Sequence, residues 1–317
     1  MPLHPIRADS TTVVRGVTGR RRRWRGVVAA LVGLVGLALP LAACSPAPGP
    51  GQTGGLAVVA STNVWGDVVN QVGGSLVSVT SFISSPSVDP HSYEANARNQ
   101  LALKKAVLVV ANGGGYDDFV DTMVASLDSP PPVLHAFTIA ATDEDNEHVW
   151  YDLQTVRDVA DEVATRLSEI DPADAATFAA NAKAFGAQIA DLEQQVADIK
   201  QKAAGTPVAI TEPLPLYLID AAGLDNLTPP EFSAAIENET DVPPAALADT
   251  LALFSGHRVR ALVYNSQTTG PQTQSVLAAA KSAGIAVVSV TETLPSGVGY
   301  VEWMQRTVTS LREAVVT

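Results

Sequence analysis

Short apolar runs alternate with longer amphipathic stretches along most of the chain. The apolar runs predict buried strands. The first begins the stretch Leu56–Gly74, and the others are Leu76–Ser84, Val107–Gly115, Pro130–Phe137, Pro207–Glu212, Val259–Asn265 and Ile285–Glu292. Helical patterns follow in the rest of 56–74 and in Asn99–Ala106, Asp117–Leu127, Leu216–Ala222, Thr273–Ala283 and Gly299–Val315. Because strands alternate with helices, we expect parallel sheets whose ligand sites lie at the carboxyl ends of the strands.

One amphipathic stretch, Asp171–Gly205, is much longer than the others. Its apolar residues recur at spacings of three and four and form a single stripe, made of Phe178, Phe185, Ile189, Leu192, Val196 and Ile199. Asp171 suits a helix N-cap, Pro172 the first helical position, and Gly205 the residue after the end. Over residues 173–203 such a helix measures about 46 Å at ~1.5 Å per residue. We therefore predict an α/β fold of two α/β lobes, each a mostly parallel sheet flanked by helices, joined by one long backbone helix.

The beginning of the chain differs from the rest. The basic cluster Arg20–Arg25 precedes an apolar run, Val27–Ala43, which ends in small residues and is typical of a secretory signal. A transmembrane anchor is the alternative, but the run is short and no stop-transfer flank follows it. Leu41–Ala43 before Cys44, the only cysteine in the chain, resembles a bacterial lipobox and implies lipidation of Cys44. We divide the chain into a signal (1–43), a Pro/Gly tether (44–55), an N-terminal lobe (56–170), the connecting helix (171–205) and a C-terminal lobe (206–317).

The charge balance limits the partners. The whole chain carries a formal net charge of −13, and removal of the arginine-rich leader makes the remainder more acidic still. An acidic surface repels nucleic acid and anionic lipid, so we expect no nucleic-acid partner and membrane contact only through the lipid anchor. The acidity suits the attraction of cations, although it equally suits simple solubility.

Four residues near strand ends are candidate ligands. His91 and His148 lie in loops of the N-terminal lobe, whereas Glu212 and Glu292 each end a predicted strand of the C-terminal lobe. A single loop histidine is more often a surface residue, and a glutamate at a strand end is more often solvated or a helix cap. Together, two imidazoles and two carboxylates suit a divalent transition metal held between the lobes.

Several neighbours of these residues have plainer interpretations. We expect Asp152 either to accept a hydrogen bond from a ligand imidazole or to cap the helix that follows it. Four aromatic residues near the proposed site are expected to form its apolar wall: Trp65, Trp150, Tyr151 and Trp303. His135 and His257 are assigned no role in the site.

Six motifs then connect the chain to a known family. They are DPHSYE, EHVWYDLQTV, FAANAKAF, TEPLPLYLIDAAGL, AAIENETDVPPAAL and ETLPSGVGYVEWM. In order and spacing the chain resembles the metal-binding lipoproteins of ABC transporters, the substrate-binding proteins that take up zinc or manganese, over Ala57–Val315. The resemblance implies two lobes joined by one long rigid helix, which the stretch Asp171–Gly205 matches.

The resemblance also implies a ligand set. It places the first ligand of the family on His91, the second on His148 and the third on Glu212, where zinc-binding members usually have histidine and manganese-binding members have glutamate. The fourth falls on Glu292, where the family normally has aspartate.

The resemblance also implies a function and a bound metal ion. We expect an extracytoplasmic, lipid-anchored, monomeric binding protein that catalyses no reaction. It is expected to capture Mn²⁺ or Zn²⁺, with Fe²⁺ as a third possibility, and to deliver the ion to an ABC permease and its ATPase subunit. Carboxylates favour manganese, whereas the Irving–Williams order favours zinc, so both metals stay open. A secreted metallohydrolase that uses the same cluster is the alternative, and a binding protein for an organic solute is a third interpretation.

Overall fold

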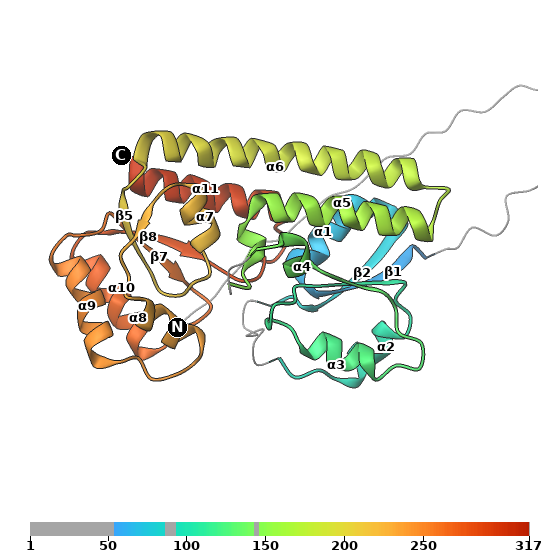
Figure 1. Cartoon of the computed structure of the whole chain (residues 1–317), viewed down its shortest axis with the longest axis horizontal. Coiled ribbons are helices and arrows are strands. Elements are labelled where there is room, and N and C mark those ends of the chain that lie inside the picture. The colour runs from blue at the N-terminus through green and yellow to red at the C-terminus, as the bar shows by residue number, and fades with distance from the viewer. Residues whose placement is uncertain (1–53, 86–92, 143–145, 317) are drawn as a thin grey trace, which may run out of the picture. The chain divides into compact units, whose positions relative to one another are not determined.

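The computed structural model describes residues 54–85, 93–142 and 146–316, which form two α/β lobes (Figure 1). The predicted signal, most of the tether and Cys44 lie outside the described residues. Among the described residues, no helix is both long enough and apolar enough to cross a bilayer.

The N-terminal lobe is built on a parallel sheet with the strand order β2-β1-β3-β4. Its strands are β1 (Leu56–Thr62), β2 (Val77–Ile83), β3 (Leu108–Ala111) and β4 (Val133–His135). Its helices are α1 (Asn63–Gly73), α2 (Ala97–Leu103), α3 (Phe119–Ala125), α4 (Ala136–Ala140) and α5 (Leu153–Ile170), with short 3-10 turns at Gly74–Leu76 and Val149–Tyr151.

The C-terminal lobe repeats this arrangement with the strand order β6-β5-β7-β8, again parallel throughout. Its strands are β5 (Pro207–Ile210), β6 (Asp225–Asn226), β7 (Ala261–Asn265) and β8 (Ala286–Val290). Its helices are α7 (Leu216–Ala221), α8 (Pro230–Glu237), α9 (Pro244–Ser255), α10 (Pro271–Ser282) and α11 (Tyr300–Val316). The first strand of each lobe lies inside its sheet, so the strand order reverses there, and such positions bind ligands in open α/β sheets.

Burial on both faces explains why the strands are nearly continuous apolar runs. In β1, Val58 and Ala60 belong to one hydrophobic cluster and Val59 to another. Successive side chains of a strand point to opposite faces, so the two clusters lie on the two sides of the sheet. The same alternation holds in β5 and β7.

The long helix, α6 (Ala175–Ala203), has 29 residues and spans about 44 Å at ~1.5 Å per residue. It starts later than the sequence predicts. Asp171 ends α5 instead of capping α6, and its main-chain N–H still donates to Leu167. The residue before a proline is disfavoured in the helical region, so Asp171 adopts φ −129° and ψ 84°, and the chain turns before α6 begins. Asp174 becomes the N-cap, while Gly205 follows the end of the helix with φ +75°, as predicted.

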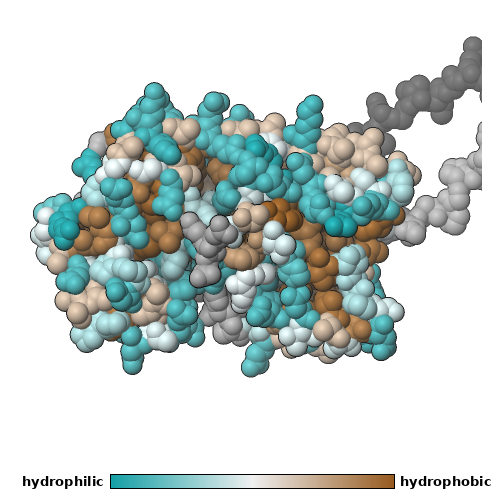
Figure 2. Space-filling view, viewed as in Figure 1, coloured by the Kyte–Doolittle hydropathy of each residue, from teal (hydrophilic) through white to brown (hydrophobic). Residues whose placement is uncertain are grey.

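The apolar stripe of α6 unites the two lobes. One hydrophobic cluster contains strand residues of both sheets together with residues of α1, α5, α6 and α11. Figure 1 shows α6 running above both lobes with α5 and α11 packed along it. Figure 2 shows mainly hydrophilic side chains along the same upper rim, in agreement with a helix that buries one stripe only. The predicted fold class, two lobes joined by one backbone helix, is confirmed.

Hydrogen bonds also tie the N-terminal lobe to the segment after β8. Asn63, the first residue of α1, donates from its side-chain amide to the carbonyl of Leu294 and accepts from its N–H, both at 2.9 Å. The carboxylate of Asp67 accepts from the N–H of Tyr300 at 2.8 Å. The two lobes are therefore joined by polar contacts as well as by the shared core.

Besides the short α4, two helices were not predicted from the sequence, α8 and α9. Each begins with a proline at its first position after another proline, at Pro229–Pro230 and Pro243–Pro244. Proline is tolerated at that position because its missing N–H would have no partner within the helix. The proline pairs were therefore a usable signal for helix starts, and α8 becomes important for the site.

Candidate metal site

His148 lies in the loop before the 3-10 turn Val149–Tyr151, and only 1% of its surface is exposed. Its Nδ1 lies 2.7 Å from Oδ1 of Asn146, which also accepts from the main-chain N–H of His148 at 3.3 Å. The amide of Asn146 is oriented because its Nδ2 donates to the carbonyl of Pro213 at 3.2 Å. An amide oxygen only accepts, so neutral His148 carries its proton on Nδ1, and Nε2 holds the lone pair that a metal ion would use.

The main chain of this loop is held from both lobes. The Tyr217 hydroxyl, from α7 of the C-terminal lobe, donates to the carbonyl of Asn146 at 2.7 Å. On the other side, Nδ2 of Asn112, at the end of β3, donates to the carbonyl of Glu147 at 2.8 Å. Asn112 is in turn held by the indole N–H of Trp65 at 3.1 Å. These contacts fix the direction in which His148 points.

Asn265, the last residue of β7, joins the two predicted carboxylates. Its Nδ2 donates to Oε2 of Glu212 and, at 2.9 Å, to Oε1 of Glu292. Both glutamates are buried, with 3% and 5% of their surfaces exposed. They meet because β5, β7 and β8 are adjacent parallel strands whose carboxyl ends lie at one edge of the sheet.

Glu292 is positioned from both lobes. Its main-chain N–H donates to Oε1 of Gln267 at 2.6 Å, which fixes the loop after β8. Its Oε2 accepts from the hydroxyl of Tyr116, a residue of the N-terminal lobe, at 3.1 Å. Burial raises the pKa of Tyr116 well above 10, and the charge of Glu292 raises it further. Tyr116 therefore stays a neutral donor to this carboxylate.

The electrostatics of the cluster disfavour several negative charges at once. Burial raises the pKa of the Glu212 carboxyl to about 8, the carboxylates of Glu237 and Glu292 add to the rise, and the hydrogen bond from Asn265 opposes it. Carboxylates gathered this closely repel one another unless protons or a cation compensate them. The arrangement is suited to binding a cation.

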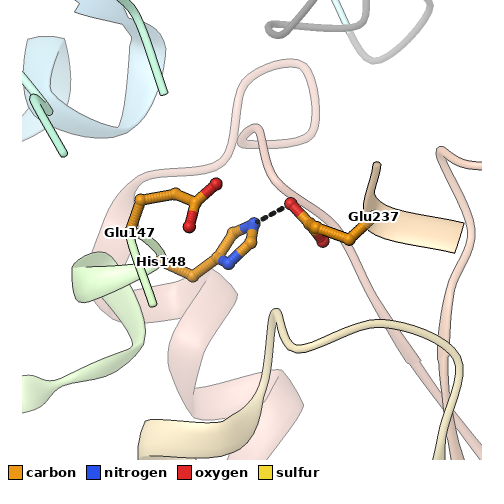
Figure 3. Close-up of side chains that lie close together, drawn as sticks. All are labelled: Glu147, His148 and Glu237. Atoms are coloured by element: carbon orange, nitrogen blue, oxygen red, sulfur yellow. Dashed lines mark ion pairs between the residues drawn. The ribbon is translucent and has the colours of Figure 1, made fainter. Parts of the chain in front are cut away.

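Glu237, the last residue of α8, was not among the predicted ligands. Its Oε1 lies 3.4 Å from Nε2 of His148 (Figure 3). With Glu147, which precedes His148, the three residues offer ligand atoms within 4.8 Å of one another. Glu237 lies within the motif AAIENETDVPPAAL, but helix α8 was not predicted there, so nothing in the sequence pattern pointed Glu237 toward His148.

Of the four predicted ligands, the structure joins Glu212 to Glu292 through Asn265 and brings His148 to Glu237. His91 lies outside the described residues. Beside it, the hydroxyl of Tyr93 donates to Oδ1 of Asn99 at 3.0 Å.

Asp152 acts as a helix cap and not as the partner of His148. Its carboxylate accepts from the N–H groups of Gln154 and Thr155, at the start of α5. Of the two roles considered for Asp152 the structure shows the capping one, and Asn146 orients the imidazole of His148. An N-cap side chain accepts from the N–H groups two and three residues later, and Gln154 and Thr155 stand at these positions after Asp152.

Buried aromatic rings surround the imidazole. The ring centre of His148 lies 5.1 Å from that of Trp150 and 6.0 Å from that of Tyr116. Trp65, Tyr151 and Trp303 are also buried. Of the four residues predicted to form the apolar wall, Trp150 lies beside the imidazole, and an apolar neighbour strengthens the electrostatic attraction between an ion and its ligands.

The sequence as a whole matches one protein family. The family model described as zinc-uptake complex component A, periplasmic, matches residues 58–314. The chain belongs to this family. The resemblance inferred from the six motifs is thereby confirmed.

Curated relatives of this family member include metal-binding lipoproteins. The manganese-binding lipoprotein MntA of Halalkalibacterium halodurans is 28% identical over 134 residues, which are 41% of this chain and 44% of that protein. The metal ABC transporter substrate-binding lipoprotein ScbA of Streptococcus cristatus is 26% identical over 179 residues, 51% of this chain and 56% of that protein. The chain thus spans about half the length of the curated relatives it matches.

Solved structures share the fold of this family member. The periplasmic zinc-binding protein TroA from Treponema pallidum superimposes with a TM-score of 0.70 at 17% sequence identity. The superposition covers 83% of this chain and 100% of that chain. The binding protein FpvC from P. aeruginosa, in complex with Ni²⁺, gives a TM-score of 0.68 at 21% identity, covering 82% of this chain and 97% of the other. At these identities the likeness establishes the fold.

Proposed function

We propose that the protein is an extracytoplasmic substrate-binding lipoprotein that captures a divalent transition metal ion, Mn²⁺ or Zn²⁺, between its lobes. It delivers the ion to an ABC permease that works with an ATPase subunit. Family membership supports this proposal, as do the names of relatives that are manganese-binding or metal ABC transporter lipoproteins.

The observation that carries the proposal is the buried cluster itself. His148 presents Nε2 toward carboxylates, and Glu212 and Glu292 are brought together by Asn265 at the sheet edge of the other lobe. We assign His148, Glu212 and Glu292 as ligands and propose His91 as a further ligand from the N-terminal lobe. Nitrogen and oxygen donors of this kind suit manganese, zinc and iron.

We further propose that the protein binds its metal without catalysing a reaction. A catalytic metal site keeps one coordination position open for water or substrate, whereas a binding site closes around the ion. Two imidazoles and two carboxylates make four protein ligands, one more than the three that catalytic zinc sites typically use, and this favours binding over hydrolysis.

The proposal is tested by metal content. The purified protein is expected to bind about one equivalent of Mn²⁺ or Zn²⁺ after treatment with a chelator and dialysis, and to leave Mg²⁺ and Ca²⁺ unbound, since imidazole ligands do not suit those ions. Elemental analysis and isothermal titration would measure both. Failure to retain either transition metal would refute the proposed function.

Lipidation of Cys44 gives a separate expectation. Replacing Cys44 by Ala removes the thiol that would carry the acyl chains, so the protein is expected to move from the membrane fraction to the soluble extracytoplasmic fraction. Cell fractionation with metabolic labelling by a fatty-acid analogue would measure the change. Equal labelling and equal membrane content of the two forms would contradict a lipid anchor at this position.

A further inference from the structure

Glu237 occupies an unusual position for an acidic side chain. It is the last residue of α8, where the helix dipole is negative and a carboxylate is disfavoured. Its side chain is only 13% exposed, so water screens the charge poorly. A carboxylate held at such a place needs compensation, by a hydrogen bond, a proton or a cation.

The facing atom of His148 adds to this need. Asn146 fixes the proton of neutral His148 on Nδ1, so the lone pair of Nε2 points toward Oε1 of Glu237 at 3.4 Å (Figure 3). Two electron-rich atoms that face each other repel, and a cation between them removes the repulsion.

The separation of the two atoms also fits metal binding. Two donors that each lie about 2.0–2.2 Å from one ion are roughly 2.8–3.1 Å apart in octahedral geometry and roughly 3.3–3.6 Å apart in tetrahedral geometry. A hydrogen bond from an imidazole nitrogen to a carboxylate is typically shorter, about 2.7–3.2 Å. The observed 3.4 Å matches the tetrahedral separation and is longer than such a hydrogen bond.

Glu237 is close to the other ligands as well. Its charge contributes to the raised pKa values of both Glu212 and Tyr116, and Tyr116 donates to Glu292. Glu237 is thus in contact with His148 and close enough to Glu212 and Tyr116 for its charge to act on both.

We propose that Glu237 is a direct ligand of the captured ion, supplied by α8 of the C-terminal lobe in addition to His148, Glu212 and Glu292. This inference rests on the proposed function, because it concerns the same ion. With Glu237 included, three carboxylates bind the ion instead of two.

A third carboxylate changes the preferred metal. Mn²⁺ is a hard ion that accepts six ligands, most of them oxygens, whereas Zn²⁺ is satisfied by four. The additional oxygen donor therefore strengthens Mn²⁺ binding more than Zn²⁺ binding. Glu237 is the residue that favours manganese in this protein.

Glu237→Gln tests this role, because glutamine keeps the size of the side chain and removes its charge. Mn²⁺ affinity is expected to fall by more than about 100-fold, since even residues that only support a ligand typically contribute 10–100-fold. Zn²⁺ affinity is expected to fall by less than about 10-fold, because Zn²⁺ needs only four donors and His148, Glu212 and Glu292 remain. Competition against a fluorescent chelator would measure both constants on the purified chain.

Three further variants separate ligation from other causes. Glu231→Gln removes an exposed charge from the same helix and is expected to leave both affinities unchanged. Glu147→Gln removes a charge from the same cluster and is expected to weaken both metals equally and by only a few-fold. Glu237→Asp keeps the charge but shortens the reach, so it is expected to behave like Glu237→Gln.

Spectroscopy supplies a direct readout of ligand number. Co²⁺ bound to the unaltered protein is expected to show the weak visible absorption of a high-coordinate site, and Glu237→Gln to show the stronger bands of a four-coordinate one. Identical spectra, or equal losses in Glu237→Gln and Glu147→Gln, would overturn the inference. If the unaltered protein bound no transition metal, the proposed function would fail instead, so the two failures are distinguishable.

Discussion

Replacing His148 by Ala is expected to lower the affinity for both Mn²⁺ and Zn²⁺ by more than about 100-fold, a larger loss than removal of a supporting residue causes. The imidazole is buried, its tautomer is fixed by Asn146, and its Nε2 points into the carboxylate cluster. Among the described residues, His148 is the only histidine in the cluster with Glu147 and Glu237, so the change removes the nitrogen donor of that group. Isothermal titration with each metal would measure the loss.

The matched control is His257→Asn. His257 is exposed and has φ +49°, a conformation that asparagine tolerates well, so its replacement is expected to leave both the fold and the metal affinity unchanged. Circular dichroism of the metal-free His148→Ala protein would establish that it remains folded. A folded His148→Ala protein whose affinity lay within a few-fold of the unaltered value would exclude His148 as a ligand.

Replacing Glu212 by Gln is expected to stabilise the metal-free protein at alkaline pH while greatly weakening metal binding. In the folded protein the pKa of this carboxyl is raised from 4.5 to about 8. Between these pH values the folded state holds a proton that the unfolded state has lost, so stability falls as pH rises from 4.5 to 8. The glutamine variant escapes this cost, which is on the order of 5 kcal/mol at pH 9.

Urea unfolding in the presence of a chelator, at pH 5, 7 and 9, would measure this effect. The stability gain of Glu212→Gln is expected to be small at pH 5 and largest at pH 9. Glu231→Gln, an exposed change on α8, is expected to show no gain at any of the three pH values. A gain that did not depend on pH would mean that burial of the Glu212 charge is not its source.

Local pattern was sufficient to predict most of the strands and the long helix. The strands of both sheets are short apolar runs because each sheet is covered on two faces, and α6 has one clear stripe because only one of its sides is buried. The start of α6 was placed too early because Asp171 and Pro172 look like a cap followed by a first turn. They are instead the turn that ends α5, and only the packing of α5 against α6 distinguishes these possibilities.

The candidate site was predictable where ligands follow strands directly and not where tertiary structure brings residues together. Glu212 and Glu292 meet because their strands are neighbours of β7, and parallel strands align their carboxyl ends. Glu237 reaches His148 from a helix that no periodicity indicated, across 89 residues of sequence. Asn146 and Asp152 both stand close to His148 in the sequence, and only their hydrogen bonds decide which one orients it.

The contacts between α1 and the segment after β8 have a consequence for folding. Asn63 and Leu294 are 231 residues apart, and Asp67 and Tyr300 are 233 apart, so these contacts close very long loops. Contacts of this range form late, because the entropy of loop closure must be overcome before they are gained. The proposed ligands are spread along this loop, from His148 to Glu292, so a partly folded chain has no complete site. Metal capture is therefore expected to be a property of the finished fold, and a chain still awaiting export or refolding would leave the surrounding metal untouched.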